Sequence, residues 1–275
     1  MLREITLGQY YPVDSVLHRL DPRVKLLGTL LYVISLFLVK GVAGYLVATI
    51  FLVSMIILSK VPVSFMLKGL KAIFVLLIIT ALINMFMTPG IPLVTIWKLT
   101  LTREGVKNAV YMIIRLVFLV VGSSIMTLTT TPSSLTFGLE KSLSWMKKIK
   151  VPVHEISMMM SIALSFIPIL LEETDIIMKA QQARGSDFES GNIFKRVKAL
   201  IPILVPLFVS AFRRANDLAL AMESRCYQGG EGRTKLHPLK YARRDKIAYV
   251  ILFIYFIVAI FVGKASFAMA NAMVP

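Results

Sequence analysis

Two arginines in this sequence share an unusual setting. The triplets Ala183–Arg184–Gly185 and Ser224–Arg225–Cys226 each place one arginine between two small residues, and 41 positions separate the two arginines. A guanidinium group is a planar fork of five N–H donors, which suits bidentate binding of a carboxylate or of backbone carbonyls. Small neighbours leave room for such a fork to enter a groove. The pattern favours two contacts with partner proteins.

A simpler interpretation explains part of the same pattern. Each arginine lies near the predicted end of a long helix, with Gly185 as a left-handed stop after the first and Gly229–Gly230 one turn after the second. A cation in the last turn of a helix contributes about 0.3–1 kcal/mol by complementing the helix dipole. Capping explains where the arginines lie but not their small neighbours, so both interpretations stay open on spacing alone.

The sequence offers few residues for catalysis or metal binding. The histidines His18, His154 and His237 belong to no His-Glu-x-x-His motif, and neither a glycine-rich phosphate loop nor a Gly-x-Ser-x-Gly motif is present. The single cysteine excludes an intramolecular disulfide and a cysteine-rich metal site. We therefore expect no catalytic residue and no metal site, and an intramembrane enzyme remains the alternative from a different class.

Composition indicates a membrane protein. Hydrophobic residues make up 57% of the chain, charged residues make up 17%, and the mean hydropathy is +0.76. We predict an all-α, polytopic membrane protein. About five transmembrane helices are expected, at 26–39, 42–59, 70–87, 108–128 and 247–263. The first is short, since its 14 residues rise only about 21 Å against a hydrocarbon core of about 30 Å.

The net charge of +16 fits membrane topology better than nucleic-acid binding. Of the 31 lysines and arginines, 18 lie between positions 141 and 246, outside the predicted spans. Positive loops stay in the cytoplasm, which places the N-terminus there as well. No zinc-finger, helix-turn-helix or RNA-binding signature accompanies the charge, so we expect no nucleic-acid partner.

Arg115 lies inside the fourth predicted span. A charge at this depth is costly unless it is paired or faces a cavity. The other predicted spans contain no acidic residue to pair with it, so a role in a transport pathway and a role as a structural tether stay equally open.

Two long helices, half apolar and half polar, are predicted at 154–186 and 193–228, after a shorter amphipathic helix at 132–150. Pro168 and Pro202 lie in matching Ile-Pro-Ile-Leu stretches, where kinks are expected. The chain thus divides into a membrane part with four spans (1–131), the helical part (132–232), and a linker with the last span (233–275). Methionines of the long helices, for which packing or partner contact is favoured over metal binding, are Met158, Met159, Met160 and Met222.

The sequence resembles a known family, the transmembrane (T) component of energy-coupling factor (ECF) transporters, which are ATP-driven importers of vitamins and metals. The resemblance covers essentially the whole chain. It rests on the two arginine triplets and on an N-terminal signature between Tyr11 and Lys25. The second triplet departs from the family's Ala-Arg-Gly form. The signature residues singled out are Pro12, His18, Asp21, Pro22, Arg23 and Lys25.

The resemblance implies an L-shaped protein of a prokaryotic cell membrane, with a multi-pass membrane part and a cytoplasmic coupling domain. It implies that Arg184 and Arg225 each dock into one of two ABC ATPase subunits, of the EcfA and EcfA' type. It also implies that the apolar faces of the coupling helices hold a separate substrate-binding membrane subunit, the S component. Met158, Met159, Met160, Pro168, Pro202 and Met222 are the expected contacts with that subunit.

By the same resemblance the chain is not an enzyme and carries no cofactor, because ATP and magnesium are bound by the partner ATPases. Its expected function is to couple ATP hydrolysis to movement of the S component during uptake of vitamins or other micronutrients. The alternative within transport is the T component of a dedicated cobalt or nickel uptake system.

Overall fold

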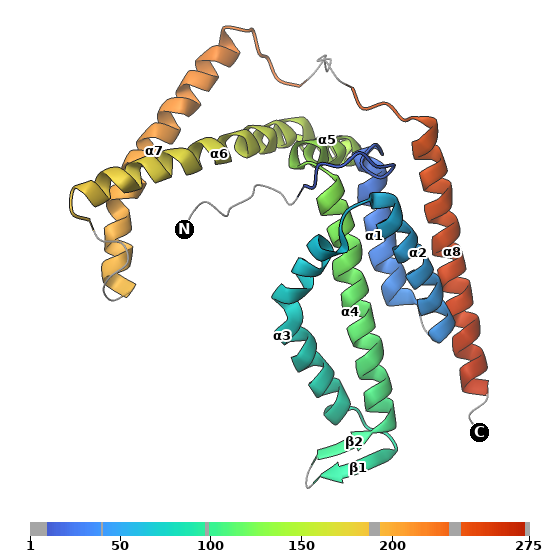
Figure 1. The fold of residues 1–275 in the computed structure, drawn as a ribbon. Helices are drawn as coiled ribbons and strands as arrows, with labels where there is room; N and C mark the ends of the chain where they lie inside the picture. The colour runs from blue at the N-terminus through green and yellow to red at the C-terminus, as the bar shows by residue number, and fades with distance from the viewer. Residues whose placement is uncertain (1–9, 40, 97–98, 187–192, 231–237, 273–275) are drawn as a thin grey trace. The chain divides into compact units, whose positions relative to one another are not determined.

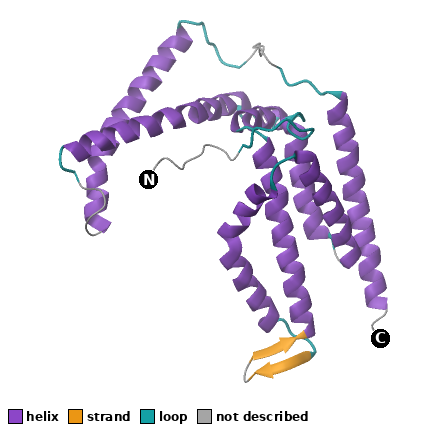
Figure 2. Cartoon of the chain, in the orientation of Figure 1, coloured by secondary structure: helices purple, strands orange, loops and turns teal. Residues whose placement is uncertain are grey.

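The computed structural model describes residues 10–39, 41–96, 99–186, 193–230 and 238–272 (Figure 1). The chain divides into two compact units. One, here called the bundle unit, comprises Gly8–Gly138 with Leu239–Pro275, and the other, the two-helix unit, contains Leu139–Pro238. Helices make up nearly all of both units (Figure 2), which confirms the predicted all-α class.

The bundle unit is built from five long helices and one hairpin. Its elements are α1 (Pro22–Leu38), α2 (Val42–Ser59), α3 (Val63–Met87), β1 (Pro92–Ile96), β2 (Leu99–Thr102), α4 (Arg103–Thr129) and α8 (Arg243–Ala272). Helix α5 (Pro132–Ser142) follows α4 and leads along the chain into the two-helix unit, which contains a 3-10 helix (Ser144–Ile149), α6 (Val153–Ala183) and α7 (Ile193–Glu223).

Five helices in the described part of the chain are long and apolar enough to cross a membrane, namely α2, α3, α4, α6 and α8. The number agrees with the prediction, but the set differs. Helix α1 has 17 residues, about 26 Å, and falls short of a full span. Helix α6, which was predicted as a half-apolar, half-polar helix and not as a span, qualifies because it has 31 residues and one half of it is apolar.

The ends of several helices depart from the prediction. Helix α3 begins at Val63, about two turns before the predicted start at position 70. The predicted helix at 132–150 ends at Ser142 and gives way to the 3-10 helix. The two long helices end at Ala183 and Glu223, a few residues before positions 186 and 228.

The antiparallel hairpin of β1 and β2 was not predicted. It connects α3 to α4, and Thr102 at its end caps α4. The Thr102 hydroxyl accepts a hydrogen bond from the Gly105 amide (3.1 Å) and donates one to the carbonyl of Thr88 (2.8 Å). The hairpin thereby joins the end of α3 to the start of α4 through one side chain.

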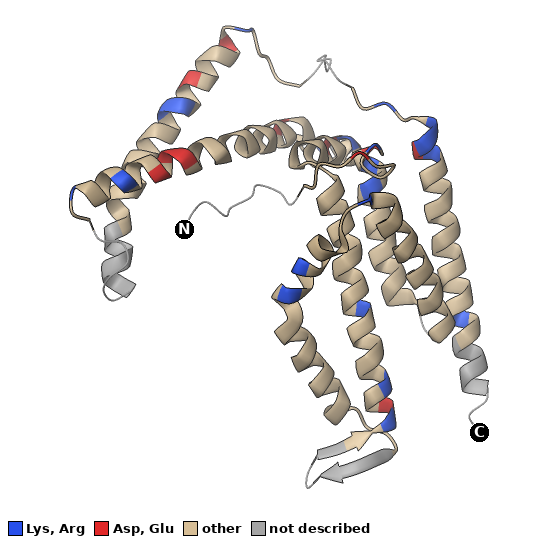
Figure 3. Ribbon diagram, in the orientation of Figure 1, with Lys and Arg blue, Asp and Glu red and all other residues tan. Residues whose placement is uncertain are grey.

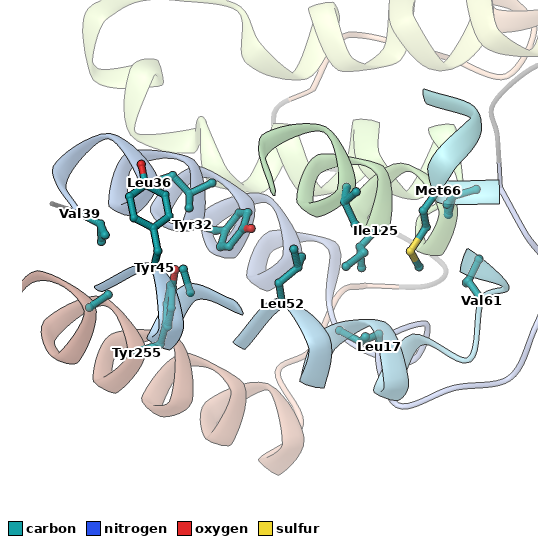
Figure 4. Packing of buried hydrophobic residues seen from close by; sticks show 14 residues of the cluster. Leu17, Tyr32, Leu36, Val39, Tyr45, Leu52, Val61, Met66, Ile125 and Tyr255 are labelled. Atoms are coloured by element: carbon teal, nitrogen blue, oxygen red, sulfur yellow. The ribbon is translucent and has the colours of Figure 1, made fainter. Parts of the chain in front are cut away.

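The buried core of the bundle unit lies between α1, α2, α4 and α8 (Figure 4). Tyr32 of α1 packs so closely on Gly122 of α4 that a Cβ added to the glycine would lie 2.2 Å from the tyrosine ring. Gly44 of α2 likewise meets the backbone of Gly263 in α8, at 3.0 Å from an added Cβ. Small residues at such positions let helices approach closely, and van der Waals packing then holds them together in a bilayer.

A buried carboxylate joins the beginnings of α1 and α8. Asp245, only 2% exposed, accepts the amide hydrogen of Asp21 at 2.9 Å and that of Ala242 at 2.7 Å. The second contact is the capping-box arrangement, in which an acidic residue in the third helical position bonds the amide of the N-cap residue. One side chain therefore satisfies backbone donors at the start of two helices.

We predict that Asp245→Asn destabilises the bundle unit by about 1–3 kcal/mol, because an amide offers one acceptor where the carboxylate offers two. Thermal unfolding of the purified protein in detergent measures the loss. Asp217→Asn, at an exposed position of α7, is the matched control and should leave the midpoint unchanged. Equal shifts for the two variants would contradict the assigned role of Asp245.

Candidate functional site

The first arginine triplet ends α6 in a Schellman motif. Arg184 is the C-cap residue, and Gly185 adopts a left-handed conformation with φ of 89°. The amide of Ser186 donates to the carbonyl of Gln181 (3.0 Å), and that of Gly185 donates to the carbonyl of Gln182 (2.9 Å). These two bonds define the motif, and the predicted role of Gly185 as the stop residue is confirmed.

The second triplet ends α7 with the same pair of hydrogen bonds. The amide of Tyr227 donates to the carbonyl of Met222 (3.1 Å), and that of Cys226 donates to the carbonyl of Glu223 (2.8 Å). The left-handed residue is therefore Cys226, with φ of 55°. The predicted end at position 228, just before Gly229–Gly230, is wrong, because the helix ends at Glu223 and the cysteine is the left-handed residue that follows. No pattern of residue types reveals this, since cysteine rarely adopts such a conformation.

The two triplets thus present their arginines in equivalent ways. Each arginine is the last residue before a left-handed residue, and all six residues of the triplets are exposed. Within the described part of the chain, neither guanidinium forms a hydrogen bond or an ion pair. Helix capping fixes the backbone around each arginine, and each exposed side chain carries five N–H donors in a planar fork, which suits binding of a ligand.

An ion pair joins α6 to α7 where the polar half of each helix begins. Arg214 donates from Nη2 to Oε2 of Glu173 at 3.1 Å. Glu173 precedes Arg184 by 11 residues, and Arg214 precedes Arg225 by the same 11 residues. Eleven residues are about three helical turns, or about 16.5 Å, so the contact lies about three turns before each arginine.

The residues expected to contact a substrate-binding subunit lie on different parts of the two helices. Met159, Met160 and Pro168 on α6 and Pro202 on α7 are exposed, whereas Met158 and Met222 are partly buried. Helix α7 has an exposed apolar face that was not singled out in the sequence. Its members, spaced as on one helical face, are Leu204, Val205, Phe208, Val209 and Phe212.

Signature residues cluster before and within the first turn of α1. Nε2 of His18 lies 3.0 Å from the carbonyl oxygen of Tyr11, and Nδ1 lies 2.7 Å from the hydroxyl of Ser15. Because a carbonyl can only accept, Nε2 carries the proton and Nδ1 accepts from the serine. Burial lowers the pKa of His18, which agrees with a neutral ring. Pro12 is exposed, in contrast to Pro22, which is buried as the first residue of α1.

The charged signature residues hold the start of α1 in place. Asp21 caps the helix by accepting from the Arg23 amide (2.9 Å), and the Arg23 guanidinium pairs with the same carboxylate (2.8 Å). Burial alone would raise the pKa of Asp21, but the hydrogen bonds from Arg23 outweigh it and lower the pKa. Lys25 donates to the carbonyls of His18 (3.3 Å) and Thr129 (2.8 Å). The signature therefore forms a structural junction of the bundle unit.

Arg115 has a partner that the sequence did not reveal. Its Nε donates to the hydroxyl of Tyr45 in α2 at 3.0 Å, and its guanidinium lies 5.8 Å from the centre of the Phe37 ring. Only acids were considered as partners from the sequence, and a phenol hydroxyl serves instead. This contact favours the structural tether over a transport pathway.

Chemistry at a metal or a nucleophile has little support among the described residues. No three His, Cys, Asp or Glu side chains of that part of the chain could hold a metal ion together. His154 is paired with Glu140 (3.0 Å), whereas His237 lies outside the described residues. The arrangement that remains is a pair of exposed arginines on matched helix ends.

Comparison with known proteins agrees with a membrane component of a transporter. A family model described as cobalt transport protein matches residues 14–236. The energy-coupling factor transporter transmembrane protein EcfT of Clostridium kluyveri is 54% identical over 250 residues, covering 90% of this chain and 93% of that protein. Proteins of the same name from Lactococcus lactis subsp. cremoris and Bacillus subtilis are each 46% identical, over 96% and 92% of this chain and 100% and 96% of their own lengths.

The family match spans the positions of both arginine triplets, and these relatives match 90% or more of the chain. The chain therefore belongs to the EcfT family of transmembrane components of energy-coupling factor transporters.

The two helix ends differ in one testable respect. Nothing lies within 4 Å of a Cβ added to Gly185, so Gly185→Val should destabilise the end of α6 by about 1–2 kcal/mol through left-handed strain alone. Cys226→Gly should relieve similar strain at the end of α7. Hydrogen exchange of the Ser186 and Tyr227 amides measures both effects, with faster exchange expected in the first variant and slower exchange in the second. Ala183→Val, at a helical position, is the control, and an equal effect there would contradict the argument.

We also predict that the ion pair between α6 and α7 sets the separation of the two arginine-bearing ends. Nitroxide labels on Cys226, the only cysteine, and on a Gln182→Cys variant report this separation by pulsed electron resonance. Glu173→Arg places two like charges together and should broaden the distance distribution, and adding Arg214→Glu should restore it. The pair is partly exposed, so we expect a small effect. Glu172→Arg, at the exposed neighbouring position, is the control, and a distribution unchanged by Glu173→Arg would refute this role.

Proposed function

We propose that this chain is the scaffold and force-transmitting subunit of an ECF importer. Two ABC ATPase subunits hydrolyse ATP, and the chain passes their movement to a separate substrate-binding membrane subunit, which takes up vitamins or other micronutrients. ATP and magnesium belong to the ATPases, and this chain is not catalytic. The observation that carries the proposal is the pair of exposed arginines on equivalent Schellman caps.

The geometry suits transmission of a mechanical movement. Both arginines sit on the ends of 31-residue helices, and the backbone around each is fixed by two hydrogen bonds. Each arginine would bind one ATPase, because the two helix ends are separate and each would enter its own groove on an ATPase subunit. The ion pair joins α6 to α7 about three turns before the C-terminal end of each helix. A change in the distance between the two ATPase grooves would therefore alter the angle at which α6 and α7 cross.

The exposed apolar face of α7 supports a second contact of the proposed assembly. Phe208 and Phe212 are more than 60% exposed in this chain, and their rings stack with centroids 6.3 Å apart. An apolar face of this size calls for a partner or for lipid. We assign it, with the exposed methionines of α6, to the substrate-binding subunit, whose own surface would be apolar.

Charge supports the proposed orientation in the cell membrane. Lysines and arginines gather at the start of α8, where its sequence begins Arg-Arg-Asp-Lys (Figure 3). Arg19, Arg23 and Lys25 lie before and in the first turn of α1. Positive charge at the starts of both helices favours a cytoplasmic location for these ends, and therefore for the N-terminus. Residues 132–232 would then face the cytoplasm as the coupling domain, between the membrane parts 1–131 and 233–275.

A dedicated cobalt or nickel uptake system is the second candidate. The observation in its favour is that the matching family model is described as cobalt transport protein. The two candidates differ in the substrate-binding subunit alone, so identification of the membrane protein that co-purifies with this chain distinguishes them.

We predict that Arg184→Ala and Arg225→Ala each weaken binding of an ATPase about 10- to 100-fold, since hydrogen bonds of charged groups contribute about 1.5–3 kcal/mol. The double variant should be worse than either. Co-purification of both ATPases and uptake by reconstituted vesicles are the measurements. Lys179→Ala, an exposed cation on α6, is the control. Normal assembly and uptake by the double variant would show that the arginines are not the docking residues.

A further inference from the structure

A cavity of about 350 Å³ lies inside the bundle unit, between α1, α2, α4 and α8. Its walls are almost entirely apolar. Helices α2 and α8 pack closely on one side of it, where Gly44 meets Gly263 and the rings of Phe51 and Tyr255 stack at 3.9 Å. Beyond Phe51 the side chains of the two helices line the cavity from opposite sides.

The cavity opens at the surface of the bundle rather than being sealed within it. Leu58 of α2 and Ile247 and Ile251 of α8 line it and are about half exposed, whereas Val24 of α1 and Ile125 of α4 are buried at its floor. Helices α2, α4 and α8 are long and apolar enough to cross a membrane. An apolar groove opening between such helices faces hydrocarbon, which calls for an apolar occupant.

One end of the groove carries a positive charge that the groove's own residues do not neutralise. Arg244 lines this end, is exposed, and has no ion-pair partner among the described residues. The neighbouring Asp245 directs both carboxylate oxygens to backbone amides. Lys25 contributes only its aliphatic stem, because its ammonium group donates to two carbonyls. Among the described residues that line the groove, Arg244 is thus the cation with neither an ion-pair partner nor a carbonyl bonded to its charged group.

We propose that this groove binds one anionic phospholipid of the bilayer, with an acyl chain between α2 and α8 and the phosphate on Arg244. The chemistry of the two ends matches such a molecule. A guanidinium binds phosphate oxygens in a bidentate way, and basic pockets between membrane helices are typical sites for anionic headgroups. The site lies in the bundle unit and does not depend on docking of the ATPases to α6 and α7.

The test uses the full-length chain in nanodiscs of equal parts phosphatidylglycerol and phosphatidylcholine, from which the protein is ejected for native mass spectrometry. We expect one retained lipid, with phosphatidylglycerol preferred about five-fold, the preference that one basic residue near the surface supplies. Arg244→Gln should abolish the preference. Arg243→Gln removes the same charge from an exposed residue that does not line the groove, and it should keep the preference.

A second pair of variants tests the acyl-chain site. Ala248→Phe fills the groove and should remove the retained lipid, whereas Val250→Phe, on the same helix but outside the groove, should keep it. The proposal is overturned if the wild-type protein retains no lipid or retains both lipids equally. It is also overturned if Arg243→Gln and Arg244→Gln behave alike, or if Ala248→Phe leaves lipid retention intact while weakening assembly with another membrane protein. Binding is measured without ATPases, so failure of this proposal and failure of the proposed function are distinguishable.

Discussion

The buried carboxylate of Asp245 is the interaction on which the bundle unit depends most directly. It bonds the amides of Asp21 and Ala242, and so ties together two helix starts that are more than two hundred positions apart in the sequence. Backbone groups within or near a bilayer have few partners outside the protein, which makes an unsatisfied donor there costly. The first turns of α1 and α8 are consequently fixed against each other, and the signature residues around Asp21 complete the same junction.

This junction also explains why the groove has its shape and its charge. Helices α2 and α8 approach closely where Gly44 meets Gly263, about five turns along α8 from Asp245. Between this contact and the junction of α8 with α1 at Asp245, side chains of α2 and α8 line the groove together with those of α1 and α4. Neighbouring residues of a helix point about 100° apart, so an inward Asp245 places Arg244 outward at the mouth of the groove. The buried contacts of Asp245 thereby position Arg244 for the proposed contact with the lipid phosphate.

Local sequence patterns, such as apolar runs and helix-stop residues, predicted most of the helices. Most features that they did not predict depend on contacts between residues far apart in the sequence. Helix α2 occupies the predicted 42–59, since an unbroken apolar run has few alternatives. The helix stop at Gly185 was predictable because glycine is the residue that most often adopts the left-handed conformation after a helix. Cys226 adopts the same left-handed conformation, which its residue type does not indicate. Tyr45 as the partner of Arg115 and Asp245 as the partner of Asp21 depend on which helices become neighbours, which no local spacing shows. The hairpin was missed because its strands are only five and four residues long.

The contrast between Gly185 and Cys226 bears on what the arginine triplets require. If a left-handed glycine were the essential feature, a cysteine in its place would cost about 1 kcal/mol or more without benefit. The structure keeps the same two hydrogen bonds at both ends regardless of that difference. What the two ends have in common is therefore the cap and the arginine that it holds at the C-cap position. Both arginines also lie 11 residues beyond the Glu173–Arg214 contact. The fold thus specifies where two guanidinium groups stand along their helices, which is the property a docking device needs.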